Sequence, residues 1–213
     1  MTPPISVALV DDHRVVTHGL RVFLESFPDL RVAGVASSGE ELLRRVGEWR
    51  PRIVILDLLM PGGIDGIETA RRLREVAPEV RVVALTASTD EARMAGILRV
   101  GACGYVRKDA DPEVLLDAVR AVARGKTFID PAVAAETAAA GPGGRPSGPL
   151  SVLSPREREV LRELAFGRTN REIGERLAIG EETVKTHVAR ILSKLGLQHR
   201  TQLALYALKA GMV

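Results

Sequence analysis

Apolar side chains follow two alternating patterns along the first 123 residues. Short runs rich in Val, Ile and Leu predict buried strands over residues 5–10, 31–36, 52–57, 81–86 and 103–106. Between them lie segments with apolar residues at three- and four-residue spacing, such as Ile67, Ala70 and Leu73, which is typical of amphipathic helices. Five strands alternating with five helices favour an α/β fold, with a doubly wound parallel sheet covered by helices on both faces.

Capping residues mark two of the helix starts in this region. Ser38 and Glu41 are spaced as in a capping box, in which a hydroxyl and a carboxylate each satisfy a backbone N–H at the start of a helix. Asp111 before Pro112 predicts an N-cap followed by a proline in the first turn. These signals place helix starts near residues 39 and 112.

The pattern changes after residue 123. Residues 141–149 read Gly-Pro-Gly-Gly-Arg-Pro-Ser-Gly-Pro, which can neither continue a helix nor pair in a sheet. The alanine-rich run at residues 132–140 could extend a helix. We therefore expect a first domain over residues 5–123, a linker over residues 124–149, and a second domain over residues 150–213.

The second domain reads as four short helices, an all-α unit. Ser154 with Glu157, and Thr169 with Glu172, have the spacing of capping boxes at two helix starts. A third helix is expected over residues 181–195, after Gly180 as its cap. The fourth, over residues 200–210, carries an apolar stripe made of Leu203, Leu205, Tyr206 and Leu208.

Composition limits the class of protein. The chain has 213 residues, 46% of them hydrophobic, which is enough for two small packed domains. No apolar run approaches the roughly 20 residues needed to span a bilayer, and no signal peptide is recognisable at the N-terminus. Cys103 is the one cysteine, so an intramolecular disulfide is impossible, and we expect it to be a small buried strand residue. These features predict a cytoplasmic protein with no membrane partner.

Charge is distributed unevenly between the two halves. Residues 151–213 carry 11 Lys or Arg against 7 Asp or Glu, a net charge of +4, whereas residues 1–150 carry 19 against 20, a net charge of −1. No acidic residue follows Glu182. A basic region of this kind favours nucleic acid as a partner. The alternative is a solvated helical face, and charge alone leaves that alternative ahead.

Candidate chemistry lies at the carboxyl ends of the predicted strands. Asp11 and Asp12 follow the first strand, Asp57 ends the third, Thr86 ends the fourth, and Lys108 comes soon after the fifth. In an open parallel sheet these ends meet at one edge, where ligands bind. Three close carboxylates repel unless a cation joins them, and oxygen ligands suit Mg²⁺. One carboxylate could then attack a phosphoryl donor and become an aspartyl-phosphate.

These motifs resemble the receiver domain of two-component response regulators. The resemblance rests on Asp11-Asp12, Leu56-Asp57 ahead of Met60-Pro61, Thr86-Ala87, and Gly104-Tyr105 ahead of Lys108. It implies a flavodoxin-like, five-stranded fold and a sensor histidine kinase as partner.

The same resemblance implies a role for each site residue. Asp57 would accept the phosphoryl group, and Thr86 and Lys108 would hold its oxygens. Thr86 and Tyr105 would move together on activation. The expected Mg²⁺ ligands are Asp12, Asp57 and the backbone carbonyl of Leu59, with Asp11 assisting through water.

One departure from the family pattern lies in the loop after Asp57. Gly62 and Gly63 make this loop one residue longer than usual, and an extra glycine could alter the backbone beside the phosphate. His13 and His18 have no partner constellation in the sequence, so we expect them to be surface or first-helix residues.

Residues 169–195 fit a helix-turn-helix. Residues 170–177 would form the first helix, residues 178–180 the turn, and residues 181–195 a second helix able to enter the major groove of DNA. Apolar residues at helical spacing would face inward: Ile173, Leu177, Val184, Val188, Ile191 and Leu195. Gly174 inside the first helix suggests close helix packing, because glycine costs up to ~1 kcal/mol relative to alanine there.

The second domain resembles the LuxR-type DNA-binding domain. The match includes Leu153-Ser154-Pro155-Arg156-Glu157 and Thr183-Val184-Lys185-Thr186-His187-Val188. Together with the receiver it implies the NarL/FixJ subfamily of response regulators. The residues it implies at DNA are Thr169, Asn170, Thr183, Lys185, Thr186, His187, Ala189, Arg190 and Lys194. Lys185, Thr186 and Ala189 would face the bases, and Ala189 stands where some members carry lysine.

The sequence therefore predicts a phosphorylation-switched transcription regulator, not a turnover enzyme. We expect it to bind double-stranded promoter DNA as a homodimer when phosphorylated, with the apolar fourth helix either at the dimer surface or packed in the core. Two alternatives stay open. One is an aspartate-nucleophile phosphatase that uses the same carboxylates and Mg²⁺. The other is a ligand-sensing regulator, although only 3% of the residues are aromatic.

Overall fold

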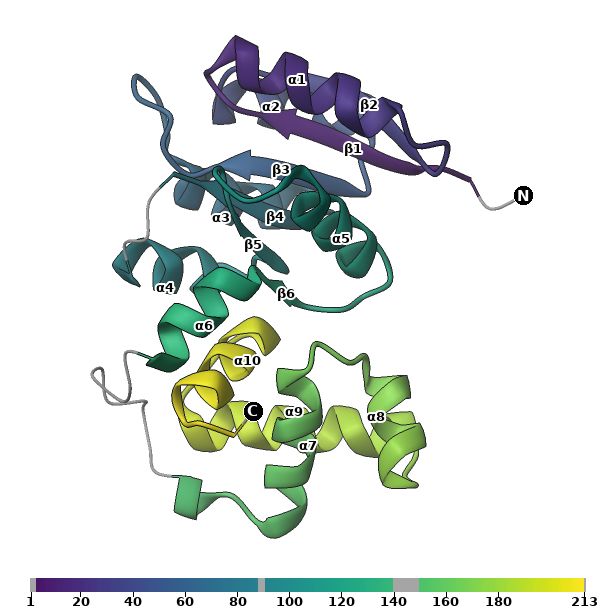
Figure 1. Cartoon of the computed structure of the whole chain (residues 1–213), viewed down its shortest axis with the longest axis vertical. Coiled ribbons are helices and arrows are strands. Elements are labelled where there is room, and N and C mark those ends of the chain that lie inside the picture. The colour runs from purple at the N-terminus through teal and green to yellow at the C-terminus, as the bar shows by residue number, and fades with distance from the viewer. Residues whose placement is uncertain (1–2, 88–90, 140–149, 213) are drawn as a thin grey trace.

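The chain forms a parallel sheet flanked by helices, followed by a helical domain (Figure 1). The structure, a computed structural model, describes residues 3–87, 91–139 and 150–212. The sheet has six parallel strands in the order β2-β1-β3-β4-β5-β6. The strands are β1 (Ile5–Val10), β2 (Leu30–Ala36), β3 (Ile53–Asp57), β4 (Arg81–Thr86), β5 (Gly104–Arg107) and β6 (Phe128–Ile129).

Helices cover both faces of this sheet. They are α1 (Arg14–Glu25), α2 (Gly39–Trp49), α3 (Gly66–Val76), α4 (Glu91–Arg99) and α5 (Pro112–Ala123). Side chains alternate along β1, so Val7 and Leu9 pack with α1 and α5, while Ala8 and Val10 pack with α2, α3 and α4. The predicted doubly wound sheet with five strands is confirmed, and a sixth strand of two residues extends it.

Helix caps largely follow the sequence signals. The Ser38 hydroxyl accepts a hydrogen bond from the Glu41 backbone N–H at 3.2 Å. The Glu41 carboxylate, however, accepts from the N–H of Ser37 at 2.8 Å, one residue before the expected one. Asp111 occupies the N-cap of α5, but its side chain makes no capping hydrogen bond.

Part of the segment predicted as linker is folded. Residues 124–149 were predicted as a linker in which residues 132–140 could extend a helix, and β6 and α6 (Pro131–Ala139) lie within this range. Asp130 is buried and accepts hydrogen bonds from the N–H groups of Arg107 at 3.1 Å and Ala132 at 2.9 Å. Val133 then packs into the core on the α2–α4 face of the sheet. The glycine- and proline-rich run at residues 141–149 lies outside the described residues.

The second domain contains the four predicted helices. A short 3₁₀ helix (Leu150–Val152) precedes α7 (Pro155–Ala165), α8 (Asn170–Leu177), α9 (Glu181–Leu195) and α10 (Arg200–Lys209). Both capping boxes, at Ser154 and Thr169, are present in full.

The turn between α8 and α9 explains the glycine inside α8. A Cβ at Gly174 would lie 2.7 Å from the backbone oxygen of Ile179. Ala178 adopts the left-handed conformation at φ 52°, which ends α8 and turns the chain toward α9. The close packing expected at Gly174 is confirmed.

The two domains are in contact through α10, which packs against α4 and α6 (Figure 1). The Thr201 hydroxyl donates to the backbone oxygen of Ala102 at 2.8 Å in a buried hydrogen bond. Leu205 packs against the core on the α2–α4 face of the sheet. The apolar stripe of α10 is therefore used in packing, both within its own domain and against the first one.

Candidate functional site

The carboxyl ends of the strands bring the predicted acidic and basic groups together. Asp57 is the last residue of β3 and 1% exposed, Thr86 is the last of β4 and fully buried, and Asp11 directly follows β1 and is 4% exposed. Adjacent parallel strands place these residues at one edge of the sheet. We refer to Asp11, Asp12, Asp57, Thr86 and Lys108 as the strand-end site.

Lys108 joins the carboxylates of this site. Its Nζ lies 2.7 Å from Asp11 Oδ2 and 2.8 Å from Asp57 Oδ2, so one ammonium bridges two buried carboxylates. Its own backbone N–H donates to the Thr86 carbonyl at 2.7 Å, which holds the lysine beside β4. The second oxygen of Asp57 accepts from the N–H of Leu59 at 3.1 Å.

Burial governs the electrostatics of the pair formed by Asp57 and Lys108. Burial raises the pKa of Asp57 above its usual range, and the nearby Asp11 carboxylate adds to this, although the hydrogen bond from Lys108 opposes it. For Lys108, burial disfavours the charged form, but hydrogen bonds to Asp11 and Asp57 outweigh it and raise its pKa. The positive charge of Lys108 alone therefore faces the negative charges of Asp11, Asp12 and Asp57.

Four side chains at this edge could hold a cation. One ligand atom each from Asp11, Asp12, His13 and Asp57 lies within 4.8 Å of the others. His13 is exposed, as expected, but its Nδ1 is 2.8 Å from Asp12 Oδ1 and 3.1 Å from Asp11 Oδ1. The sequence analysis did not assign His13 to the site. Its position directly after Asp11-Asp12 was the available signal.

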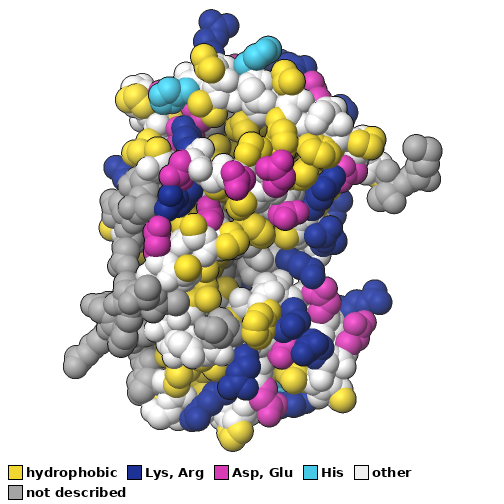
Figure 2. Space-filling model, in the orientation of Figure 1, with side chains coloured by type: hydrophobic (Ala, Val, Ile, Leu, Met, Phe, Trp, Pro, Cys, Tyr) yellow, Lys and Arg dark blue, Asp and Glu magenta, His cyan; other side chains and the backbone are white. Residues whose placement is uncertain are grey.

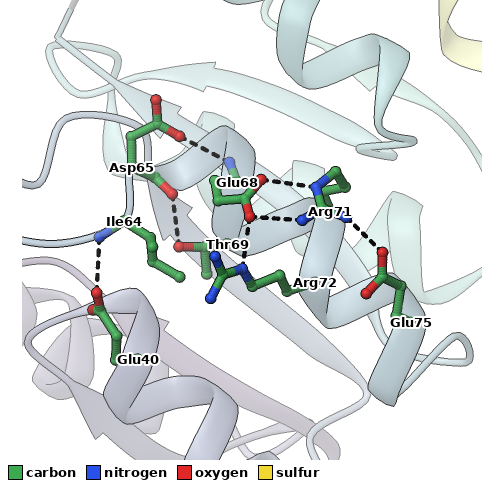
Figure 3. A network of polar contacts seen from close by, with 8 residues as sticks. All are labelled: Glu40, Ile64, Asp65, Glu68, Thr69, Arg71, Arg72 and Glu75. Atoms are coloured by element: carbon green, nitrogen blue, oxygen red, sulfur yellow. Dashed lines mark hydrogen bonds and ion pairs between the residues drawn. The ribbon is translucent and has the colours of Figure 1, made fainter.

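The lengthened loop beside Asp57 is anchored by α2. Gly62 takes up the extra residue in a left-handed conformation at φ 92°. Two residues later, the N–H of Ile64 donates to Glu40 Oε1 at 2.8 Å (Figure 3). This hydrogen bond lowers the pKa of Glu40 below its usual range. Asp65 then caps α3 by accepting from the Glu68 N–H at 2.8 Å.

Gly66 allows α3 to begin directly against the acceptor strand. A Cβ at this position would overlap the backbone oxygen of Asp57 and lie 2.7 Å from Leu58 Cα. Rotation of a side chain could not relieve these contacts, because both are made by backbone atoms. Gly66 and Glu40 thus shape the loop and the helix start beside Asp57, and no sequence pattern pointed to either residue.

Tyr105 lies in the core behind the site and not within it. The residue is in β5, 1% exposed, and packs in the core on the α2–α4 face. It therefore sits on the strand next to the one that Thr86 ends.

The predicted DNA-reading face of α9 is accessible. Lys185, Thr186, Ala189 and Arg190 are exposed, while the apolar residues of the same helix are buried in the domain core. Figure 2 shows several Lys and Arg side chains on the lower half of the molecule, over this domain. Lys185 pairs with Glu182 at 2.6 Å, so DNA would compete with an existing local ion pair.

Three further residues predicted at DNA also have partners within the domain. Lys194 Nζ lies 2.6 Å from Glu157 Oε2, on the same carboxylate that completes the capping box of α7. Thr169 caps α8, and the side-chain oxygen of Asn170 accepts from Arg200 at 2.6 Å. Thr183 is exposed in the first turn of α9, and His187 is partly buried.

A buried strand-end site with a bridging lysine, coupled to an exposed helix-turn-helix, defines a class of two-domain regulators. Comparison with known proteins agrees with this architecture. Residues 7–120 match the response regulator receiver domain, and residues 151–207 match the bacterial regulatory proteins of the luxR family. The chain belongs to the response regulators with a LuxR-type DNA-binding domain, of the NarL subfamily.

Relatives of full length support this assignment. The chain is 38% identical to the transcriptional regulatory protein LiaR of Bacillus subtilis, over 98% of this chain and 99% of that protein. It is 40% identical to the transcriptional activator DevR/DosR of Mycobacterium tuberculosis, over 95% and 94% of the two chains. These relatives are transcriptional regulators, which favours this function over the phosphatase and ligand-sensing alternatives.

Solved structures of response regulators align with this chain over nearly its whole length. The alignment with the response regulator ChrA of a heme-sensing two-component system covers 100% of both chains, with a TM-score of 0.54 and 38% identity. The RcsB–DNA complex covers 97% of this chain and 98% of that one, with a TM-score of 0.60 and 27% identity. Within the residues that the structure describes, no helix is long and apolar enough to cross a membrane.

Proposed function

We propose that Asp57 accepts a phosphoryl group from a sensor histidine kinase, and that this modification controls promoter binding by the helix-turn-helix formed by α8 and α9. The receiver would span residues 5–123 and the DNA-binding domain residues 150–213, in a cytoplasmic protein. The observation that carries the proposal is the position of Lys108 Nζ, 2.8 Å from Asp57 Oδ2 and 2.7 Å from Asp11 Oδ2 at the strand ends.

The strand-end site fits Mg²⁺. Its donors are carboxylate oxygens on Asp11, Asp12 and Asp57, with the backbone carbonyl of Leu59 close by in sequence, and oxygen donors are the ligands that Mg²⁺ prefers. A divalent cation would also balance carboxylates that Lys108 alone leaves in excess. When bound, Mg²⁺ would supply charge neutralisation and orientation for the incoming phosphoryl group.

The chain's own residues account for the transfer step. A carboxylate oxygen of Asp57 attacks the phosphorus of a phosphohistidine, so that an O–P bond forms while the N–P bond to the departing imidazole breaks. Lys108 then moves its hydrogen bond from the carboxylate to a phosphoryl oxygen, and the Thr86 hydroxyl approaches another. We propose that the phosphoryl group stays on Asp57 as a signal, so that the chain carries one phosphoryl group and does not act as a turnover enzyme.

Phosphorylation would act on the contact between the domains. Thr86 ends β4 and Tyr105 lies on the neighbouring β5, and we propose that both move when the phosphoryl group arrives. The next helix along the chain is α4, which packs against α10. Release of α10 would free its surface for a homodimer on promoter DNA. RcsB, a solved neighbour, has been determined as two dimers bound to two parallel DNAs.

Intact-mass measurement tests the acceptor assignment. Wild type, Asp57→Asn and the control Asp65→Asn are incubated with Mg²⁺ and acetyl phosphate, a small phosphodonor. We expect wild type and the control to gain the mass of one phosphoryl group, and Asp57→Asn to gain none. Thermal unfolding curves would verify that all three proteins are folded. A phosphoryl group on Asp57→Asn would contradict the assignment.

A further inference from the structure

A cavity of about 230 Å³ lies between the two domains, next to the contact made by α10. This volume is several times the roughly 30 Å³ that one water occupies in the liquid. The first domain contributes Arg81 and Cys103, the connecting segment contributes Lys126, and the second domain contributes His199, Arg200 and Thr201. We call it the interdomain cavity.

Arg200 is a partly buried cation whose hydrogen-bond partners are all neutral. Its guanidinium donates to the side-chain oxygen of Asn170 at 2.6 Å and to the backbone oxygen of Arg168. Its Nε is buried and has no hydrogen-bond partner among the described residues. Burial lowers the pKa of Arg200 to about 10, although the charge of Glu172 opposes this.

The other cations of the cavity add to this excess. Arg81 Nη1 donates to the backbone oxygens of Val122 at 2.6 Å and Ala123 at 3.0 Å, which carry no net charge. Lys126 forms an ion pair with Glu172 at 2.6 Å. Two guanidinium groups and one ammonium therefore share a single paired carboxylate at this cavity.

Neighbouring groups make the cavity still more positive. Arg74 Nη1 lies 2.8 Å from His199 Nε2 at the edge of the cavity. His199 is the N-cap of α10, whose first turn contains no acidic residue to offset the partial positive charge of the helix N-terminus. The side chains of Arg81, Lys126 and Arg200 carry the argument, and the helix end only reinforces it.

We propose that the interdomain cavity binds a small anion with a phosphate-like oxyanion group, and that the bound anion opposes separation of the two domains. Guanidinium groups bind such oxygens with paired, charge-assisted hydrogen bonds. Because Arg81 belongs to the sheet domain and Arg200 to the helical domain, one anion between them joins the two. The site is separate from the strand-end site, and its binding of an anion can be measured without phosphorylating Asp57.

Cys103 offers a specific reporter for this site. It is the one cysteine of the chain, it lines the cavity, and it is partly buried. N-Ethylmaleimide is uncharged, so its reaction rate with Cys103 reports access to the cavity without competing for the cations. Sulfate is the first probe, because it mimics a phosphate group and cannot phosphorylate Asp57.

The experiment titrates sulfate into the full chain without Mg²⁺, at constant ionic strength maintained with chloride. We expect calorimetry to show saturable binding, and alkylation of Cys103 to slow over the same concentration range. Arg81→Gln and Lys126→Gln should each weaken sulfate binding roughly tenfold, which corresponds to about 1.4 kcal/mol, because each removes one charge-assisted hydrogen bond. Arg72→Gln, which removes an exposed cation of α3, should leave sulfate binding unchanged.

Three outcomes would overturn the proposal. They are an alkylation rate that does not saturate with sulfate, equal effects of sulfate and chloride, and equal weakening by Arg81→Gln and Arg72→Gln. The anion could be free inorganic phosphate or the phosphate group of a metabolite. Repeating the titration with inorganic phosphate and with glycerol phosphate distinguishes these two sources. Tighter binding of the ester would indicate a phosphorylated metabolite, and tighter binding of inorganic phosphate would indicate the free ion.

Discussion

Single residues hold the Asp57 carboxylate in position from several directions. Lys108 contacts one oxygen at 2.8 Å and the Leu59 N–H contacts the other at 3.1 Å. Behind this carboxylate, Gly66 lets the start of α3 lie against the backbone of Asp57. The acceptor therefore depends on a missing side chain as well as on charged neighbours.

Gly66→Ala should destabilise the receiver and displace Asp57. The added methyl group would meet backbone atoms, including Leu58 Cα at 2.7 Å, and overpacking of this kind costs about 1–3 kcal/mol. We expect a lower free energy of unfolding in urea, together with slower phosphorylation by acetyl phosphate.

Gly47→Ala is the matched control for this prediction. Gly47 lies inside α2, and an added Cβ there would meet nothing within 4 Å. Alanine should stabilise that helix by up to ~1 kcal/mol, because it is the better helix former. If Gly66→Ala were as stable as Gly47→Ala, the close approach of α3 to β3 would not matter.

Residues at the strand ends were predictable from the sequence, whereas their supports were not. Asp11, Asp57 and Thr86 each follow or end an apolar run, and parallel strands bring such ends together. Glu40 binds the loop at Ile64 from 24 positions earlier in the chain, and no local pattern marks that pairing.

At the level of elements, α9 combines an exposed reading face with internal ion pairs. Arg190 is exposed and forms no ion pair with the residues that the structure describes. Lys194 instead pairs with Glu157, a carboxylate that is 4% exposed. Arg190 and Lys194, both predicted at DNA, should therefore differ in how much their removal destabilises the domain.

Arg190→Ala and Lys194→Ala should separate DNA contact from domain stability. Loss of one phosphate contact lowers the slope of log affinity against log salt by about 1, and we expect this for Arg190→Ala with little change in thermal stability. Lys194→Ala should also lower the unfolding temperature, because it leaves the buried Glu157 carboxylate without its ammonium.

Fluorescence anisotropy across a salt series, with calorimetric unfolding of each variant, measures both effects. Arg171→Ala is the control, since Arg171 is exposed on α8 and pairs only with Glu175 among the described residues. An unchanged salt slope in Arg190→Ala would exclude that residue from the DNA interface.

Element boundaries followed closely from sequence patterns, with instructive exceptions. Helix α9 begins and ends where Gly180 and Gly196 cap it, and β4 has the predicted bounds. The two-residue strand β6 was not predicted, because it is too short to show an alternating pattern. Asp130, between β6 and α6, accepts a hydrogen bond from the N–H of Arg107 at the end of β5, and sequence position alone does not reveal this contact.

At the scale of the whole molecule, the domain contact includes a titratable group. Burial, together with the nearby Arg74 cation, lowers the pKa of His199 below its ordinary value of 6.5, although a hydrogen bond with the backbone of Arg99 opposes this. Arg81 and Arg200 line the same cavity as His199. Lys126 holds the pKa of Glu172 at about 2, so their ion pair persists through mildly acidic pH.

The domain contact should weaken as the pH falls through 6.5. Above that value His199 is neutral whether the domains are in contact or apart. Below it, the imidazole takes up a proton more readily when the domains are separate. The arrangement with the domains in contact therefore loses stability as the pH falls, until the pH passes the lower pKa that His199 has in that arrangement. Small-angle scattering between pH 8 and pH 5.5 should show a growing radius of gyration in wild type.

His199→Gln is the control for this titration. Glutamine can still accept a hydrogen bond from Arg74 but does not titrate, so its scattering profile should depend less on pH. Identical profiles for wild type and His199→Gln would show that other groups govern the contact.

The order of domains followed from the sequence, but their contact did not. Patterns within each half predicted a sheet domain and a helix-turn-helix domain. The hydrogen bond from Thr201 to Ala102 joins residues 99 positions apart across two separately patterned units, and no periodicity reports it. The apolar stripe on α10 had two possible uses, and the structure shows packing against both domains.

The central claim is that the state of Asp57 controls DNA binding. The most direct measurement is the affinity for promoter DNA, in fixed salt with Mg²⁺, with and without the phosphate mimic BeF₃⁻, for wild type and Asp57→Asn. We predict tighter binding by wild type with the mimic, by about 5- to 150-fold if the coupling is of ordinary size, and no change for Asp57→Asn. Equal affinities in all four conditions would contradict the account.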